Sequence, residues 1–169
     1  MRIIPTQRMT ANKKNGYALY TAIILTGFLI LISYVTANLS IKELALSTIA
    51  ADSHLAFYNA DGGIECALYA DVKNGATSAF DINTGGTVTC NSQSITTGSQ
   101  TVQTSPTQSS RVGGGGVSNR TSIFQLNFSQ GCAIVSVTKN ADGTTFMQSK
   151  GYNSCTGTKR LERGVQIQY

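Results

Sequence analysis

One stretch of the chain, residues 17–41, limits what the rest can fold into more than any other. It reads YALYTAIILTGFLILISYVTANLSI and holds no charged side chain over twenty-five residues. An apolar run of about eighteen residues or more is long enough to cross a bilayer as a helix. At about 1.5 Å per residue this run is about 37 Å long, against a hydrocarbon core of about 30 Å. The sequence therefore predicts one transmembrane helix here, and no second stretch has this character.

The sixteen residues before this stretch are polar and basic. They include Arg2, Arg8, Lys13 and Lys14 and no acidic residue. Because basic flanks stay on the cytoplasmic side, we expect the N-terminus to be cytoplasmic. The chain would then cross the membrane once, and its C-terminal part would lie on the other side. A cleavable secretory signal has an apolar core of about 7–15 residues. The core here is longer and runs on into a helical pattern, so we do not expect removal of the whole segment.

The junction between Lys13-Lys14-Asn15-Gly16 and Tyr17 is abrupt, because the apolar run begins at once. It resembles the prepilin leader of type IV pilin-like proteins. The resemblance implies that a prepilin peptidase cuts between Gly16 and Tyr17, that Tyr17 is then N-methylated, and that the apolar helix is kept. Residues 1–16 would be the leader and residues 17–41 the transmembrane half of a longer helix. The alternative is a single-pass anchor with an uncut tail.

One position departs from the pattern of that family. Most pilins carry Glu at the fifth mature position, where it pairs with the amino terminus of a neighbouring subunit. The fifth position here is Thr21, and no acid lies between Tyr17 and Lys42. The departure weakens the likeness to a major pilin. It suits minor pilins of the PilX type and tip pseudopilins, many of which lack this acid.

The helical pattern continues over residues 42–75, the expected exported half of the helix. Small and apolar residues recur every four positions, with two more beside them: Ala56, Ala60, Ile64, Leu68 and Val72, with Phe57 and Ala67. This spacing predicts one packed face, and polar residues fall largely elsewhere: Asp52, His54, Asn59, Asp61, Glu65 and Asp71. Gly62-Gly63 predicts a kink or local break, because each glycine costs about 1 kcal/mol inside a helix. Asn74-Gly75 predicts the helix end.

Part of this half strengthens the resemblance. Residues 56–69, AFYNADGGIECALY, are similar to a segment of proteins with a PilX-type N-terminal region. With the junction and the apolar run, the resemblance covers residues 13–73. It implies an α+β fold, a long N-terminal helix followed by a small antiparallel β-rich head. It also implies partners: other pilin subunits through the helix, the inner membrane and the pilus assembly platform.

Residues 76–169, the expected head, are long enough for one small domain and are rich in Thr, Ser, Gly, Asn and Gln. Five short runs have strand character: residues 87–90, 121–128, 132–138, 144–149 and 164–169. In residues 121–128 the alternation places Phe124 and Leu126 on one face and Gln125 on the other. Residues 140–143, NADG, predict a hairpin turn, and residues 105–116 predict a flexible surface loop.

The cysteines fit an exported domain. All four, Cys66, Cys90, Cys132 and Cys155, follow the apolar run. Small exported domains with a thin core gain stability from disulfides. Four cysteines allow three pairings, and chain order favours Cys66–Cys90 and Cys132–Cys155. Zinc sites use close Cys-x-x-Cys pairs, which are absent from this sequence.

Charge and chemistry give little support for other classes. The net charge is +5, but residues 1–16 carry four bases, which leaves nine bases and eight acids, a net charge of +1. We therefore do not expect nucleic acid as a partner. The local basic cluster Lys159, Arg160 and Arg163 is typical of a solvated strand edge, with DNA or surface contact through it as the alternative. His54 is the one histidine and lies near the membrane stretch, so we expect neither an enzyme nor a cofactor.

The sequence thus indicates a structural minor pilin or pseudopilin of a bacterial type IV pilus or related secretion filament, low in copy number or at the tip. Its head would lie outside the membrane, and at the cell surface after assembly. The alternative is a membrane-anchored, disulfide-stabilised binding module that does not polymerise. A tethered enzyme would need an active site that the sequence does not contain.

Overall fold

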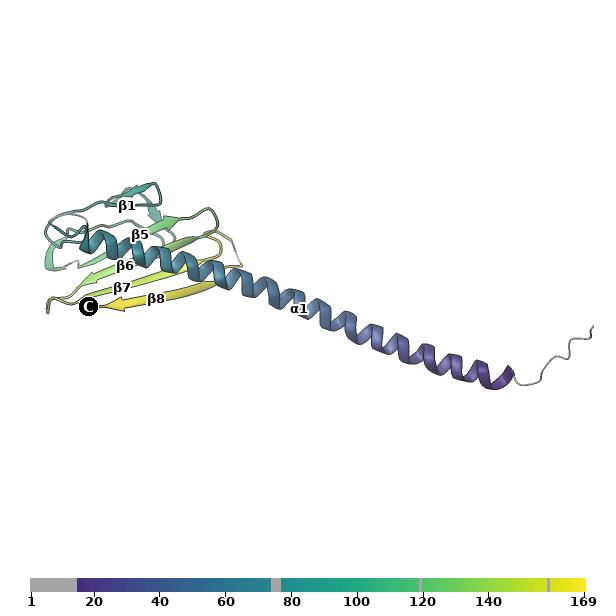
Figure 1. Cartoon of the computed structure of the whole chain (residues 1–169). Helices are drawn as coiled ribbons and strands as arrows, with labels where there is room; N and C mark the ends of the chain where they lie inside the picture. Colours follow the sequence, from purple (N-terminus) through teal and green to yellow (C-terminus); the bar gives the residue numbers. More distant parts are fainter. Residues whose placement is uncertain (1–14, 74–76, 119, 158) are drawn as a thin grey trace, which may run out of the picture. The chain divides into compact units, whose positions relative to one another are not determined.

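A computed structural model describes residues 15–73, 77–118, 120–157 and 159–169 (Figure 1). These residues form one long helix, eight strands and a short 3-10 helix, Gly116–Ser118. The helix is α1, Asn15–Val72, and the strands are β1, Val88–Cys90; β2, Gln93–Ile95; β3, Thr101–Val102; β4, Gln108–Ser109; β5, Thr121–Asn127; β6, Cys132–Lys139; β7, Thr145–Tyr152; and β8, Glu162–Gln168. The chain divides into two compact units, Met1–Ser47 and Thr48–Tyr169, so the last part of α1 belongs with the strands.

The main sheet has four antiparallel strands in chain order, β5-β6-β7-β8. The hairpin predicted at residues 140–143 joins β6 to β7, where Asn140 N donates to Thr144 O at 2.9 Å and Gly143 takes a φ of 91°. Two small hairpins, β1–β2 and β3–β4, precede the sheet. The predicted α+β fold, a long N-terminal helix followed by an antiparallel β-rich part, is confirmed.

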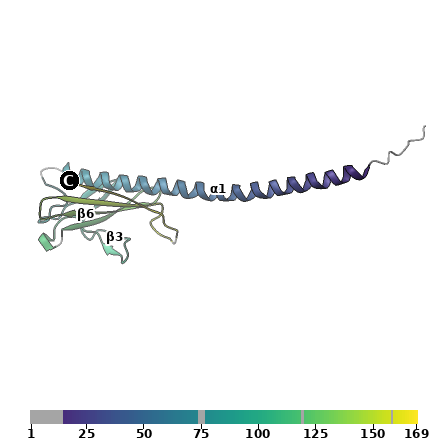
Figure 2. The same cartoon turned by 90° about the horizontal axis from the view of Figure 1, so that it is seen from below.

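Side chains pack on both faces of the main sheet. Figure 2 shows the last part of α1 along one face and β3 on the opposite side. The larger cluster lies on the α1 side and includes Ile64, Phe80, Phe124, Val135 and Met147. A smaller cluster on the other side joins Val102, Cys132, Ile134 and Tyr152. We call these two faces the helix face and the outer face of the sheet.

The packed side of α1 differs from the predicted row of every fourth residue. Ala56, Ala60 and Ile64 are buried as expected, but Leu68 and Val72 are exposed, and so is Phe57. The reason is geometric, because a step of four residues turns about 40° too far in a helix of 3.6 residues per turn. A straight row therefore leaves the packed side. The buried positions follow mixed steps instead: Ala56, Asn59, Ala60, Gly63, Ile64, Cys66, Ala67 and Ala70.

The break predicted at Gly62-Gly63 is wrong, because α1 continues through both glycines. A Cβ on Gly63 would lie 2.4 Å from Ser149 Oγ and 2.9 Å from Ala133 Cβ. Glycine is needed here because the sheet approaches the helix closely, and the packing energy outweighs its poor helix propensity. The helix ends at Val72, while the predicted stop at Asn74-Gly75 lies outside the described residues.

The prediction of a flexible loop for residues 105–116 is also wrong in its second half. Ser110, Val112 and Gly113 are buried, and Arg111 forms a bridge to Ile123 of β5. Gly113 has a φ of 62°, and a Cβ there would lie 2.6 Å from Thr84 O. The glycines let this segment lie directly on the backbone of residues 79–86, an arrangement that any side chain would prevent.

Candidate functional site

The first part of α1 presents apolar side chains on every side. All large apolar residues within 17–41 are exposed, and Tyr17 is 78% exposed. Each of the five Ser and Thr hydroxyls in this stretch donates to a backbone carbonyl three or four residues earlier: Thr21, Thr26, Ser33, Thr36 and Ser40. Polar groups in lipid must be satisfied inside the segment itself. By length and composition, α1 is thus suited to cross a membrane near the N-terminus.

The residues expected at the leader junction lie in the first turn of α1, which begins at Asn15. Gly16 and Tyr17 are both helical, while Lys13 and Lys14 lie outside the described residues. Thr21 Oγ1 donates to Ala18 O at 3.0 Å and to Tyr17 O at 3.2 Å. Its hydroxyl is therefore bonded to its own helix, and it carries no charge for an outside group.

The last part of α1 has a second face that points away from the sheet. Phe57, Tyr58, Leu68, Tyr69 and Val72 are exposed on it. At 100° per residue these positions fall within about a third of the helix circumference. A shallow hollow of about 410 Å³ lies there, lined by apolar side chains with Glu65 and Lys73. We call this surface the outward face of α1; the spacing of every fourth residue had predicted three of its residues, Phe57, Leu68 and Val72, on the packed side instead.

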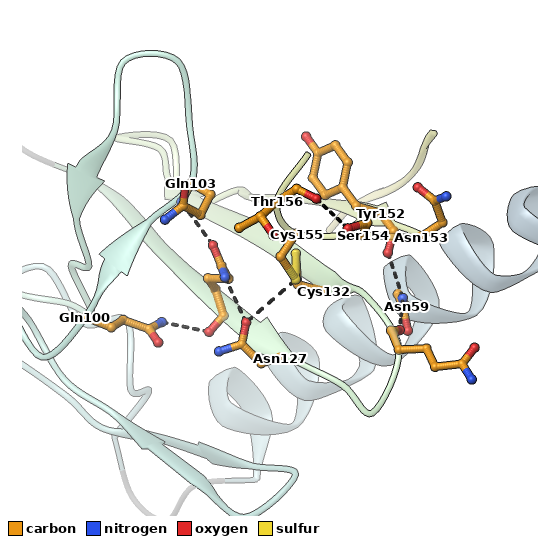
Figure 3. Close-up of a disulfide and its surroundings, with 12 residues drawn as sticks. Asn59, Gln100, Gln103, Asn127, Cys132, Tyr152, Asn153, Ser154, Cys155 and Thr156 are labelled. Carbon is orange, nitrogen blue, oxygen red and sulfur yellow. Dashed lines mark hydrogen bonds between the residues drawn. A yellow bond between two sulfur atoms is a disulfide. The ribbon is translucent and has the colours of Figure 1, made fainter. Parts of the chain in front are cut away.

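Both disulfides favoured by chain order are present, and each lies on one side of the sheet. Cys66–Cys90 ties α1 to β1, and Cys132–Cys155 ties the start of β6 to the segment after β7. Figure 3 shows the second of these beside Asn127 and Tyr152. The two bridges therefore stabilise the helix face and the outer face separately.

Asn59 and Asp71 are polar residues on the packed side of α1, although the spacing of the apolar residues predicted them elsewhere. Asn59 Nδ2 donates to Gln130 O and to Tyr152 O, both at 2.8 Å (Figure 3). These bonds join the helix to the β5–β6 turn and to the end of β7. The buried position of Asn59 could not be predicted from periodicity, because periodicity identifies apolar positions only. It does not show which polar side chain will have a backbone carbonyl within hydrogen-bonding distance.

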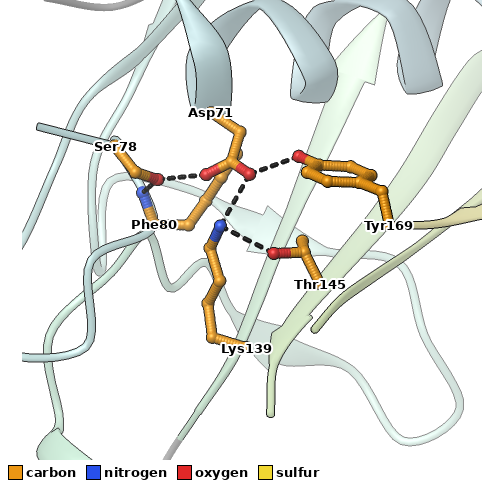
Figure 4. Close-up of polar contacts among 6 residues, drawn as sticks. All are labelled: Asp71, Ser78, Phe80, Lys139, Thr145 and Tyr169. Atoms are coloured by element: carbon orange, nitrogen blue, oxygen red, sulfur yellow. Dashed lines mark hydrogen bonds and ion pairs between the residues drawn. The ribbon is translucent and has the colours of Figure 1, made fainter. Parts of the chain in front are cut away.

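Asp71 is the centre of a polar cluster near the end of α1 (Figure 4). Its side chain is 4% exposed and pairs with Lys139 Nζ at 2.6 Å. Ser78 Oγ and the Tyr169 hydroxyl also donate to this carboxylate. Burial raises the pKa of Asp71, but the hydrogen bonds from Lys139, Ser78 and Tyr169 outweigh it and hold the pKa below its ordinary value. The cluster joins α1 to β6 and to the residue after β8.

A groove of about 600 Å³ lies on the outer face of the sheet. Its floor is formed by Ile123, Ile134, Ser136 and Gln148, one wall by Gln103, Thr104 and Ser105, and its far end by Lys150, Tyr152, Arg160 and Glu162. We call it the outer groove. This groove could not be predicted from the sequence, because its floor and wall come from segments that are not adjacent in the chain.

The charged end of the outer groove is closely paired. Tyr152 donates to Glu162 Oε2 at 2.7 Å, and Lys150 Nζ lies 3.1 Å from Glu162 Oε1. The Arg160 guanidinium lies 3.8 Å from the centre of the Tyr152 ring. Burial and the bond to Glu162 raise the pKa of Tyr152 to about 12, while the bond from Tyr152 lowers that of Glu162. Both groups keep their ordinary protonation states at neutral pH.

Two arginines of the basic cluster predicted from sequence make separate contacts. Arg160 lies on the Tyr152 ring. Arg163 Nε donates to Ser53 Oγ of α1 at 2.7 Å, away from Arg160. His54 is exposed on α1. Within the described ranges, no three His, Cys, Asp or Glu side chains are close enough to hold a metal ion.

Comparisons with protein-family models, with curated proteins and with solved structures find no match for this chain.

Proposed function

We propose that this chain is a structural subunit, a minor pilin or pseudopilin, of a bacterial type IV pilus or related secretion filament. The observation that carries the proposal is the continuity of α1. One unbroken helix is apolar on all sides in its first part and packs on a disulfide-tied antiparallel sheet in its last part. The leader-like junction before Tyr17 supports the same proposal, with the helix in the inner membrane before assembly and the head outside it.

The outward face of α1 supports a role in assembly. A domain that worked alone would gain nothing from Phe57, Tyr58 and Tyr69 in water, and contiguous exposed apolar surface commonly marks an interaction site. The lipid-suited first part and this outward face lie on the same helix. Other subunits of the filament are the partners proposed for both, and the assembly platform and prepilin peptidase are the partners proposed before assembly.

Thr21 supports a low-copy or tip position. A buried amino terminus of a neighbouring subunit costs free energy unless an acid faces it. The Thr21 hydroxyl is bonded to its own helix, and no acid lies between Tyr17 and Lys42. Such a subunit is poorly suited to repeat along a long fibre and is suited to a place where few neighbours depend on it.

Intact mass and N-terminal sequencing of the protein from membranes test the processing step. In cells with an active prepilin peptidase, we expect a chain that starts at Tyr17 and carries a methyl group. Cells that lack the peptidase are the control and should yield the uncut chain. A chain that keeps residues 1–16 in the presence of active peptidase would contradict the proposal.

Quantifying subunits in sheared filaments tests the position. We expect the chain to be present as a small fraction of the filament mass, and Thr21→Glu to raise that fraction by restoring an acid. Thr26→Glu is the matched control, because it places the same charge on the same helix at a position with no such role. If the unchanged chain made up most of the filament mass, the charge argument would be wrong.

A membrane-anchored binding module is a second candidate, and the outer groove is the observation that favours it. In that case the chain would stay in the membrane, uncut and absent from sheared filaments, with the head still folded. The two tests above therefore separate the candidates.

A further inference from the structure

We propose that the outer groove, which crosses the outer face of the sheet between residues 103–105 and the β7–β8 connection, binds a neutral oligosaccharide. This goes beyond the proposed function, because a filament subunit can assemble without any ligand. The groove is entirely within the compact unit that contains the sheet. Its volume of about 600 Å³ lies in the range of small-molecule sites, about 300–1,000 Å³.

The polar groups that line the groove match a ligand rich in hydroxyls. Among the described residues, the side chains of Gln103, Ser105, Ser136 and Gln148 have no hydrogen-bond partner, although all four line the groove. Amides and hydroxyls both donate and accept, as sugar hydroxyls do. Since they come from a wall and from the floor, they can bond to opposite sides of one ligand.

The floor also offers apolar contact. Ile123 is half-buried and Ile134 lies beside it on the next strand, with Gln125 opposite Ile134 in the register. A sugar ring presents C–H groups on its faces and hydroxyls at its edge, so both kinds of surface find a counterpart. The Tyr152 ring is already covered by Arg160, so a stacking platform is missing and the expected affinity is weak, about 1 mM.

The charges of the groove favour a neutral ligand over an anionic one. Lys150 and Glu162 are paired with each other, and Glu162 also accepts from Tyr152. Arg160 lies on the Tyr152 ring, so all the charged groups are gathered at one end of the groove. The rest of the lining, from Gln103 to Gln148, has no charged side chain and favours a neutral ligand.

The backbone of the floor disfavours an extended peptide. Peptides that add to a sheet bond to an unpaired strand edge. Of the floor strands, β6 and β7 each pair with a neighbour on both sides, and the edge of β5 at Ile123 is bonded to the backbone of Arg111. Recognition in this groove must therefore come from side chains, which again matches a hydroxyl-rich ligand.

Chemical-shift mapping of the isotope-labelled full chain in phosphocholine micelles tests the proposal; glycoside detergents are avoided because their head groups would compete. The probes are neutral tetrasaccharides of glucose, galactose, mannose and N-acetylglucosamine, each at about 10 mM. We expect at least one to shift the resonances of Ile123, Ser136 and Gln148. Gln148→Ala removes one hydrogen-bonding side chain and should weaken the binding of that probe about fivefold.

Gln168→Ala is the matched control, because Gln168 lies on the same sheet face outside the groove, opposite Phe146. It should leave binding unchanged. Gln103→Ala removes a group from the wall of the groove and should also weaken binding about fivefold, which keeps the test valid if one variant is unstable. The proposal is overturned if no neutral probe shifts groove resonances, if an acidic tetrasaccharide binds more tightly than all neutral ones, or if neither groove variant weakens binding.

Discussion

The two parts of α1 have the same secondary structure and opposite surroundings. Up to Ser47 the helix has large apolar side chains on every side and a glycine, Gly27, with nothing within 4 Å of its Cβ position. From Thr48 onward one side consists mostly of alanine and glycine, and Gly63 would clash with the sheet if it carried a Cβ. Side-chain size on this helix therefore depends on whether the neighbouring groups belong to the chain itself. Residues are small where the chain's own sheet packs, and large where the surroundings come from outside the chain.

Exchanging glycine for leucine in each part gives the largest expected effect. Gly63→Leu should lower the free energy of unfolding of the head by about 3–4 kcal/mol, because Ser149 and Ala133 have no room to move. Gly27→Leu is the matched control and should leave the head unchanged. Denaturant unfolding in micelles, followed by tyrosine circular dichroism, measures both. Equal stability of the two variants would show that the close approach at Gly63 does not hold.

Removing either disulfide should cost about 3 kcal/mol of unfolding free energy in the chain-entropy description. Cys66 and Cys90 are 24 residues apart and Cys132 and Cys155 are 23 apart, so the losses of the two double Cys→Ala variants should be nearly equal. Only the first variant frees α1 from β1. A much larger loss there would mean that the bridge also holds the helix in its packed position. Non-reducing peptide mapping checks the pairing, and a Cys66–Cys155 peptide would contradict it.

Asp71→Asn tests the polar end of the packed part. We expect a loss of about 2 kcal/mol at pH 7, because the charged acceptor of the bonds from Lys139 and Tyr169 is removed. The folded pKa of Asp71 is lowered, so its contribution is complete above the ordinary value of 3.8 and is lost as pH falls through the folded pKa. The free energies of unfolding of Asp71→Asn and of the unchanged protein, measured from pH 7 to pH 2, should therefore converge in acid.

Asp52→Asn is the control for that comparison, since Asp52 is an exposed carboxylate on the same helix. It should change stability little at any pH. A gap between Asp71→Asn and the unchanged protein that persisted at pH 2 would show that the loss is one of packing and not of charge.

Ser149→Ala should have the smallest effect and the opposite sign. Ser149 is fully buried against Gly63, and its Oγ has no hydrogen-bond partner among the described residues. Removing an unsatisfied buried hydroxyl is neutral or stabilises by up to about 1 kcal/mol. Ser122→Ala is the matched control, because Ser122 Oγ accepts from Gly113 N at 2.9 Å and its loss should destabilise by about 1 kcal/mol. A destabilised Ser149→Ala variant would point to a partner for this hydroxyl.

Features that depend on local periodicity could be predicted from the sequence. The apolar run, the alternation of residues 121–128 and the turn at residues 140–143 each act over a few neighbours, and β5, β6 and β7 begin or end within three residues of the expected places. Cysteine order also sufficed for the bridges. In these cases the residues concerned are close along the chain or carry a period of their own.

Features that depend on distant partners could not be predicted. From the sequence alone, Asn59 is predicted to be exposed to solvent, because its acceptors Gln130 O and Tyr152 O come from distant parts of the chain. From the sequence alone, Gly63 is predicted to weaken the helix, because the sheet packed against it is not evident. Gly113 is likewise predicted to lie in a flexible loop, because the close approach of the Thr84 backbone is not evident. The short strands β2, β3 and β4 have two or three residues each, too few for any period to appear.

The pairing of each cysteine with the next one in the chain has a consequence for how the head would acquire its bridges under the proposed export. When a chain passes through a translocon from its N-terminal side, Cys66 and Cys90 emerge before Cys132 is within reach. The first thiol available to Cys66 is then its final partner, and the same holds for Cys132 and Cys155. We expect oxidation in the order of emergence to give the correct bonds directly, without the isomerase that interleaved pairings require. The head should therefore oxidise correctly with a simple thiol oxidase alone.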